Sequence, residues 1–408
     1  MNDSFAKSVR KDFALLINNP DIAYLDSAAT THRPDCVLKA IENFYKESNA
    51  NPLRGLYELS VKATDCYEQA RDKVRAFINA DSCEEIVFTG NTTGSMNLLG
   101  YSLGEYLLNE GDEVLITIME HHSNILPWQH AVRRKNAVLK YIECDSEGKL
   151  DIDAFKAMLS DKTKIVSVCG ISNVLGCLND IKTLAKAAHE KGAVFVCDGA
   201  QMVPHMPVDV KDLDVDFLAF SGHKMCAPMG IGVLYGKAEL LDKMPPFMTG
   251  GEMIEYVTRF DATYAELPHK FEAGTVNASG AVGLRAAIEY YEEVGFDNIV
   301  EQEAVLGRYA FEQLKDIPHL NLLGAHDADS HHGIFTFTID DVHPHDIAAI
   351  MDSDKVCVRA GHHCAQPLMQ FMNTQSTARV SLAFYNTFEE IDRMAESIKN
   401  IRPRMGFR

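Results

Sequence analysis

Apolar and polar residues alternate in blocks along the first 235 residues of the chain. Short apolar runs centred near residues 86, 115, 167, 196 and 218 predict buried strands, and the segments between them have helical spacing. Each run ends at a polar residue able to bind a ligand. Because parallel strands present their carboxyl ends at one sheet edge, the pattern predicts an α/β fold with a mostly parallel, doubly wound sheet and a ligand along that edge.

The pattern changes after Tyr235. A long irregular stretch covers residues 245–274, and stretches of this length in a compact protein are usually functional or lie at an interface. A long helix is expected over residues 278–293, followed by mixed helices and short strands up to a final helix from Phe388. This mixture predicts a second, smaller α+β domain.

Length, charge and cysteine usage narrow the class of protein. The 408 residues predict two or three domains. A formal charge of −19 disfavours nucleic acid or anionic membrane as a partner, although solubility explains it more simply. The first ten residues lack the apolar core of a signal peptide and no apolar run could span a bilayer, so we expect a cytoplasmic protein. The ten cysteines stand singly, which favours reduced thiols and leaves no recognisable metal site.

Two residues at neighbouring strand ends, Asp198 and Lys224, suggest cofactor chemistry. Asp198 ends one apolar run, and Lys224 follows the next in Ser221-Gly-His-Lys224. A lysine beside a buried strand can lose enough solvation to lower its pKa and form a Schiff base. An acid on the next strand would suit the protonated pyridine nitrogen of pyridoxal phosphate. An ordinary loop lysine and strand-end aspartate explain the same residues.

A short polar turn between a predicted strand and helix is suited to an anion. The turn Gly90-Asn-Thr-Thr-Gly94 follows the strand near residue 86, and a helix is expected from Ser95. Free N–H groups at a helix start, together with the hydroxyls of Thr92 and Thr93, could bind a phosphate. A plain helix N-cap explains the same residues.

Four further polar residues stand at predicted strand ends or in a loop. His121 and His122 follow the strand near residue 115, and Asn173 follows the strand near residue 167. Ligands bind at this edge of an open α/β sheet, although such histidines are more often structural. Arg54 lies in a turn-rich loop of the kind that carries binding groups, although a solvated arginine is the commoner case.

The second domain carries the segment Arg359-Ala-Gly-His-His-Cys364-Ala. A thiol beside two imidazoles and one guanidinium has several cationic groups that favour its thiolate. The His-His-Cys run also suggests a metal site, but a fourth ligand at the usual zinc spacing is missing. Arg379 lies in an apolar stretch, which indicates a carboxylate partner from the protein or from a substrate.

Three of these segments resemble the SufS-type cysteine desulfurases of the class V aminotransferase group. Ser221-Gly-His-Lys224 and Asp198-Gly-Ala-Gln201 are shared across the group, whereas Arg359-x-Gly-His-His-Cys364-Ala is specific to the SufS-like branch. The resemblance covers essentially the whole chain. It implies fold type I of the pyridoxal phosphate enzymes and a homodimeric transferase. The implied activity is conversion of L-cysteine to L-alanine, with the sulfur passed to iron-sulfur cluster assembly through a SUF system.

The resemblance also implies roles for single residues. Lys224 would form the Schiff base and move protons, His121 would stack on the cofactor ring, and Cys364 would take the sulfur as a persulfide. Asp198 would pair with the pyridine nitrogen and Gln201 with the phenolic oxygen. The phosphate would be held by Thr92, Thr93, Ser221 and His223, with Thr275 reaching in from the second subunit. Substrate would be bound by Arg379 and Asn173 at its carboxylate, together with Arg359 and Arg54.

The resemblance also predicts how the chain is divided into domains. Residues 1–20 would form an N-terminal segment that packs with the small domain. Residues 21–265 would form the large domain that binds pyridoxal phosphate. Residues 266–408 would form an interdomain helix and a small C-terminal domain carrying the Cys364 loop.

Some positions depart from the family pattern. Many relatives have His-Arg-Gly where this chain has Leu53-Arg-Gly55, and a histidine where it has Tyr57. Both differences weigh against an acid–base role for that loop. The usual Arg-Gly-Thr-Thr-Glu turn is here Gly90-Asn-Thr-Thr-Gly94, which affects details of the phosphate loop more than cofactor identity.

A histidine pair suggests a protein partner. Val342-His-Pro-His345-Asp resembles the version found in relatives that hand sulfur to a zinc-containing, scaffold-like acceptor, in which the second histidine can enter the partner's zinc shell. The resemblance therefore implies such a contact for His345. A helix-start histidine after Pro344 explains the residue equally well.

Two rival functions stand beside desulfuration. The nearer is a selenocysteine lyase or cysteine sulfinate desulfinase, which differs in its need for the thiol. The more distant is a non-catalytic binding or scaffold protein on the same fold, because fold does not determine function.

Overall fold

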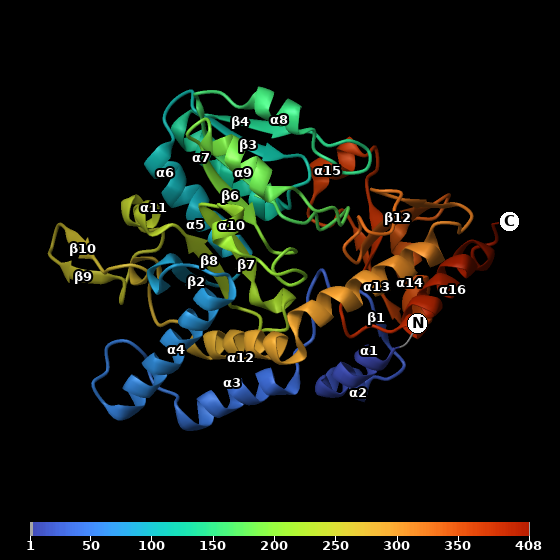
Figure 1. The fold of residues 1–408 in the computed structure, drawn as a ribbon, viewed down its shortest axis with the longest axis horizontal. Helices are drawn as coiled ribbons and strands as arrows, with labels where there is room; N and C mark the ends of the chain where they lie inside the picture. The colour runs from blue at the N-terminus through green and yellow to red at the C-terminus, as the bar shows by residue number, and fades with distance from the viewer. Residues whose placement is uncertain (1–2, 408) are drawn as a thin grey trace.

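The computed structural model describes residues 3–407, and a seven-stranded sheet lies at the centre of its larger domain (Figure 1). The strand order is β2-β8-β7-β6-β5-β3-β4. The strands are β2 (Ile86–Thr89), β3 (Glu113–Thr117), β4 (Val138–Ile142), β5 (Thr163–Cys169), β6 (Val194–Asp198), β7 (Phe217–Ser221) and β8 (Gly232–Gly236). Strands β3 to β7 pair in parallel, and β8 runs antiparallel to both of its neighbours. All five strands predicted from the apolar runs are present.

Helices cover both faces of this sheet. Successive strand residues point to opposite sides, and because the buried strands are largely apolar, both sides must be shielded from water. In β3, Leu115 belongs to one apolar cluster, while Val114 and Ile116 belong to another. The helices are α3 (Asp35–Glu47), α4 (Glu58–Phe77), α5 (Thr92–Leu98), α6 (Gly104–Leu107), α7 (Leu126–Lys135), α8 (Ile152–Met158), α9 (Ile181–His189), α10 (Val210–Leu213), α11 (Ala238–Lys243) and α12 (Ala278–Val294). The predicted doubly wound α/β architecture is confirmed.

A smaller α+β domain follows α12, as the change of pattern predicts. Its four-stranded sheet has the order β11-β12-β15-β14 and is antiparallel. The strands are β11 (Leu320–Leu322), β12 (Ile334–Ile339), β14 (Arg359–Gly361) and β15 (Thr377–Ser381). The helices are α13 (Phe296–Leu314), α14 (Pro344–Ser353), α15 (Gln366–Phe371) and α16 (Phe388–Arg404).

The N-terminal region lies against the small domain (Figure 1). Helices α1 (Ser4–Val9) and α2 (Ala14–Asn18) are joined by a short turn, where Arg10 forms a 2.9 Å ion pair with Glu390. Strand β1 (Ala23–Tyr24) pairs in parallel with β13 (Val356–Cys357). The chain therefore still contacts the small domain a few residues beyond position 20, and the division at residues 20 and 265 remains a proposal.

The stretch at residues 245–274 contains a hairpin that the sequence pattern does not predict. Strands β9 (Ile254–Val257) and β10 (Ala262–Tyr264) pair antiparallel and project from the rest of the molecule (Figure 1). Most of their residues are exposed, so no buried face leaves a pattern of alternating apolar residues. Among the residues that the structure describes, no helix is long and apolar enough to cross a membrane.

Candidate active site

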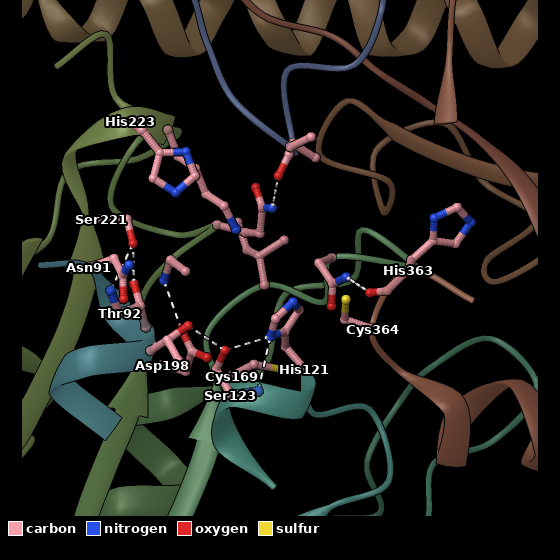
Figure 2. Close-up of a pocket in the computed structure, with 18 of the residues that line it drawn as sticks. Asn91, Thr92, His121, Ser123, Cys169, Asp198, Ser221, His223, His363 and Cys364 are labelled. Atoms are coloured by element: carbon pink, nitrogen blue, oxygen red, sulfur yellow. Dashed lines mark hydrogen bonds between the residues drawn. The ribbon is translucent and has the colours of Figure 1, made fainter. Parts of the chain in front are cut away.

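A cavity of about 270 Å³ lies at the carboxyl ends of β6 and β7, against the loops of the small domain (Figure 2). Asn91, Thr92, Ser221 and His223 stand on one side, and His363 and Cys364 on the other. Residues of both domains therefore share one cavity, as expected for the carboxyl edge of a doubly wound sheet.

Lys224 and Asp198 both line this cavity. Asp198 is the last residue of β6, and Lys224 ends the short helical turn that follows β7. Burial lowers the pKa of Lys224 to about 8, against the opposing effect of the Asp198 carboxylate. Burial also raises the pKa of Asp198, against the Ala200 N–H that it accepts at 3.0 Å and the Lys224 charge. The site thus holds an amine that loses its proton near neutral pH beside a buried acid.

The polar turn after β2 meets the end of β7. The backbone N–H of Thr92 donates to the Ser221 hydroxyl at 2.8 Å, and the two hydroxyls are 2.7 Å apart. Helix α5 begins at Thr92, three residues before the predicted start, because Asn91 caps it by accepting the Gly94 N–H. A Cβ on Gly232 would lie 2.5 Å from the Asn91 Cα, so the glycine in β8 permits this close approach.

His121 faces the cavity as a neutral ring (Figure 2). Burial lowers its pKa to about 3, and the nearby charge of Lys224 acts in the same direction. Its Nδ1 accepts the backbone N–H of Ser123 at 3.1 Å. Because a neutral imidazole carries one proton, that proton is on Nε2. The Ser123 hydroxyl also lies 2.7 Å from the Thr93 hydroxyl, which links His121 to the turn suited to a phosphate.

The cavity wall has polar groups suited to pyridoxal phosphate. The Nε2 of Gln201 donates to the Ala28 carbonyl at 2.8 Å, while its buried Oε1 has no hydrogen-bond partner among the described residues. A buried acceptor of this kind needs a donor, and a phenolic hydroxyl is one. The paired hydroxyls and helix start at Thr92 and Ser221 suit a phosphate. The donor and acceptor set therefore fits this cofactor.

A family model described as Aminotransferase class-V matches residues 23–394 of this chain. The match spans far more than half of the sequence. The chain belongs to the class-V aminotransferase family. This confirms the wider group named by the resemblance, while the SufS-type branch stays a prediction.

Known members of this family are similar to the chain over almost its whole length. A Staphylococcus epidermidis protein named "Probable cysteine desulfurase" is 50% identical over 399 residues, which cover 97% of this chain and 96% of the relative. The apo structure of a cysteine desulfurase from Thermococcus onnurineus NA1 is 40% identical, with a TM-score of 0.92 and 97% of each chain covered. The Escherichia coli cysteine desulfurase CsdA is 33% identical, with a TM-score of 0.90 and 98% of each chain covered.

In this class-V aminotransferase, the two arginines assigned to the substrate, Arg359 and Arg379, both form ion pairs with the carboxylate of Asp26. Arg359 Nη2 lies 2.8 Å from Asp26, and Arg379 Nη2 lies 3.3 Å from the same side chain. Arg379 is buried, which lowers its pKa, while Asp26 opposes that shift. Sequence reasoning predicted a carboxylate partner for Arg379 but did not identify Asp26. The only signal in the sequence is its position two residues after the short strand β1, which many aspartates share.

Cys364 is exposed at the mouth of the cavity, in a turn held by the large domain. The side-chain amide of Asn173 donates to the His363 carbonyl at 2.8 Å, and the backbone carbonyl of Asn173 accepts from Arg379 at 2.9 Å. Burial lowers the pKa of His363 to about 3, so its ring is neutral. Asn173 therefore contacts both the Cys364 turn and the arginine that the resemblance assigns to the substrate.

Two residues assigned by the resemblance do not line this cavity. Arg54 is exposed and pairs with Glu252 at 2.8 Å, next to the hairpin, and its guanidinium also donates to the Ile254 carbonyl. Within one chain, Arg54 thus lies outside the cavity with its charge paired to Glu252, and its assignment to substrate binding stays a prediction. Thr275 is exposed as well, in keeping with its assignment to the site of a second subunit.

Proposed function

We propose that this protein is a cysteine desulfurase that uses pyridoxal phosphate. It converts L-cysteine to L-alanine and keeps the sulfur as a persulfide on Cys364. The observation that carries the proposal is one cavity lined by Lys224, Asp198 and Cys364, drawn from both domains. A relative that is 50% identical is named "Probable cysteine desulfurase", and a solved cysteine desulfurase is 40% identical, which supports the same reaction.

Pyridoxal phosphate supplies an electron sink next to the carbon that loses sulfur. Lys224 anchors it and moves protons, which its pKa of about 8 permits near neutral pH. Asp198 would pair with the positive charge of the pyridine nitrogen, and this role would explain a carboxylate buried at that strand end. Gln201 would meet the phenolic oxygen, and the turn from Thr92 would hold the phosphate together with Ser221, Thr93 and His223, which all line the cavity.

Arg379 orients the substrate through its carboxylate. Its guanidinium is buried, with Asp26 and the Asn173 carbonyl as partners and an unpaired Nε among the described residues. A planar guanidinium fixed in this way binds a carboxylate with defined geometry. Asn173 and the half-exposed Arg359 stand beside it in the cavity wall. The substrate sulfur then faces the Cys364 side of the cavity.

Sulfur moves in one displacement. The Cys364 thiolate attacks the sulfur of bound cysteine, and an S–S bond forms as the substrate Cβ–S bond breaks. The electron pair of the broken bond moves to Cβ, which takes a proton and becomes the methyl group of alanine. One thiol of the protein and one of the substrate thus become a persulfide and a C–H bond, so no outside oxidant is needed.

Mass spectrometry of the holoenzyme after cysteine treatment tests this function. We expect one additional sulfur on Cys364 and an equal amount of alanine. Cys364→Ser should keep the cofactor but lose both products, and Lys224→Ala should lose the borohydride-stable link to the cofactor. Alanine release by Cys364→Ser at the wild-type rate would reject the thiol mechanism. Comparison of cysteine with selenocysteine and cysteine sulfinate separates the nearer rival enzymes.

We also propose a homodimer, supported by exposed apolar side chains near the hairpin. Phe260 is 98% exposed and Leu56 is 99% exposed, and Tyr256, Val257 and Tyr264 of the hairpin are exposed as well. A group of exposed apolar side chains marks an interaction surface. Thr275 then enters the partner's cofactor site. Light scattering should give twice the chain mass, and Phe260→Ser with Leu56→Ser should give monomers. Val138→Ser, which changes an exposed residue of edge strand β4, is the control.

We further propose that the acceptor of the sulfur is a zinc-containing scaffold-like protein of a SUF-type iron-sulfur assembly system. His343 and His345 are exposed at the start of α14, with ring centroids 4.9 Å apart. His345 enters the acceptor's zinc shell. Zinc-dependent activation by such an acceptor should disappear in His345→Ala and persist in His319→Ala, another exposed histidine. Unchanged activation in His345→Ala would remove the contact.

The cytoplasm is the proposed location of this protein. All ten of its cysteines are free, which suits a reducing compartment.

A further inference from the structure

The turn that carries Cys364 is fastened to the large domain by His122. The backbone N–H of His122 donates to the Cys364 carbonyl at 2.7 Å. Its side-chain Nε2 accepts the backbone N–H of Gln366 at 3.1 Å. His122 therefore bonds to the chain at Cys364 and again at Gln366, two residues later. His122 and Gln366 are 244 residues apart in the sequence.

The backbone of this turn needs such support. His363 has φ of 50° and Cys364 has φ of 54°, so two consecutive residues with side chains lie in the left-handed region. That region disfavours residues other than glycine, and it persists at functional sites only when the surroundings hold it. The Cys364 N–H donates to Nδ1 of His362, two residues earlier, at 3.2 Å. This bond lies within the turn and does not tie it to the rest of the cavity.

The chemistry of His122 matches the acceptor role. Its pKa is lowered by burial and by the nearby His362, whose ring centroid lies 5.7 Å away, so the imidazole is neutral and Nε2 can accept. Gln366 is the first residue of α15, and its N–H has no carbonyl partner within the helix. Loss of the imidazole would remove this bond to the large domain and loosen the end of the turn at Gln366, although Asn173 and the His122 backbone still bond to His363 and Cys364.

We propose that His122 is a positioning residue that holds the Cys364 sulfur in line with the substrate sulfur through the imidazole bond to Gln366. The proposal rests on the proposed function, because it concerns the sulfur-transfer step of that reaction. His122 needs no contact with substrate or cofactor for this role. A displacement of about 1 Å at a reacting atom can slow a reaction by about a hundredfold, so a modest shift of the turn has a large effect.

Single-turnover experiments on the holoenzyme test the proposal. His122→Phe keeps the size of the ring without an acceptor, His122→Gln restores an acceptor, and His130→Phe changes an exposed histidine of α7 as the control. We expect persulfide formation on Cys364 to be about tenfold to hundredfold slower in His122→Phe. The cysteine concentration that half-saturates the change in cofactor absorption should not move. His122→Gln should recover most of the rate, and His130→Phe should match the wild type.

The outcomes separate this proposal from the proposed function. If the wild-type holoenzyme forms no persulfide on Cys364 after cysteine treatment, the proposed function itself is wrong. A wild-type rate in His122→Phe, or an equal loss of cysteine binding in that variant, overturns the positioning role. If His122→Phe does not fold, His122→Ala removes the acceptor without added bulk and is judged by the same two readouts.

Discussion

Burial controls the proton state of the residues around the cavity. The pKa of His121 falls to about 3 and that of His223 to about 4, in both cases mainly through desolvation and then through Lys224. Lys224 itself falls to about 8 for the same first reason. The site therefore contains neutral imidazoles and an amine that exchanges its proton near neutral pH, the state required of a nucleophile and general base.

The pKa of Lys224 predicts how the apo-protein takes up pyridoxal phosphate. Only the neutral amine attacks an aldehyde, so the rate of Schiff-base formation should rise with pH and level off above about 8, well below the 10.4 of a free lysine. Asp198→Asn should lower the midpoint, because the Asp198 charge raises the Lys224 pKa. Visible absorption follows the reaction, and a lysine model compound corrects for titration of the cofactor. A midpoint near 10.4 would contradict the prediction.

Helix α4, strand β2 and the segment before α12 meet at one buried ion pair. Arg71 of α4 donates to Glu272 at 2.7 Å, and Glu272 also accepts the backbone N–H of Phe88 in β2 at 2.7 Å. Tyr67 donates to the other carboxylate oxygen at 2.9 Å. Glu272 lies three residues before Thr275, so this pair anchors the segment that the dimer proposal directs to the second subunit.

Removal of one partner of this pair should be costly. Arg71→Met would leave the Glu272 carboxylate buried and uncompensated, with an expected loss of about 3–5 kcal/mol in the free energy of unfolding. Arg75→Met breaks an exposed pair with Asp72 in the same helix and should cost less than about 1 kcal/mol. Urea unfolding compares the two variants. Equal losses would show that burial of the pair is unimportant.

Acid should destabilise the protein through the same pair. Burial alone would raise the pKa of Glu272, but the Arg71 charge and hydrogen bonds hold it at about 2 in the folded state, whereas an unfolded glutamate titrates at about 4.3. Because the folded pKa is the lower one, this stability is present above pH 4.3 and is lost as the pH falls towards 2. The contribution should vanish in Glu272→Gln, as measured by unfolding across that range.

The two domains of the molecule are joined by close backbone packing. A Cβ on Gly176, in the loop after β5, would lie 2.0 Å from the His331 carbonyl oxygen of the small domain. Thr336 of β12 donates to the Val174 carbonyl in the same loop, and Asn173 contacts the Cys364 turn. The domain contact and the active site thus share one short segment.

Gly176→Ala should therefore damage both stability and sulfur transfer. Gly176 has φ of 70° and Gly192 has φ of 71°, but nothing lies within 4 Å of a Cβ at Gly192. Gly192→Ala should cost about 1–2 kcal/mol for its backbone conformation alone, and Gly176→Ala should cost more because backbone atoms must move. Urea unfolding and persulfide formation on Cys364 are the measurements. Equal stability in the two variants would argue against a tight domain contact.

Exposure decided which elements the sequence pattern revealed. Buried strands such as β5 and β6 are continuous apolar runs and were predicted. Strand β4 was not predicted, because it lies at the sheet edge and is half-exposed. In the small domain the pattern predicts strands near Leu320 and Phe335 and over residues 355–359, but it does not predict β15, because Arg379 interrupts the apolar run of that strand. Asp26, from a distant segment, makes this arginine compatible with burial. Periodicity reports burial, and it fails where burial depends on a partner elsewhere.

The amino-acid sequence by itself determined the sheet class and the strand ends at which Asp198 and Lys224 stand, because both follow from local runs of apolar residues. The residues beside Cys364 also predict a reactive thiol there, which stays a prediction; His363, one of the two imidazoles expected to favour the thiolate, is neutral in the structure. Only the tertiary structure decided that Asp26 pairs with Arg379, 353 residues away, and that His122 fastens the turn at Gln366. Contacts between distant segments depend on how the two domains pack, and no local pattern of residue types encodes which distant residues will meet.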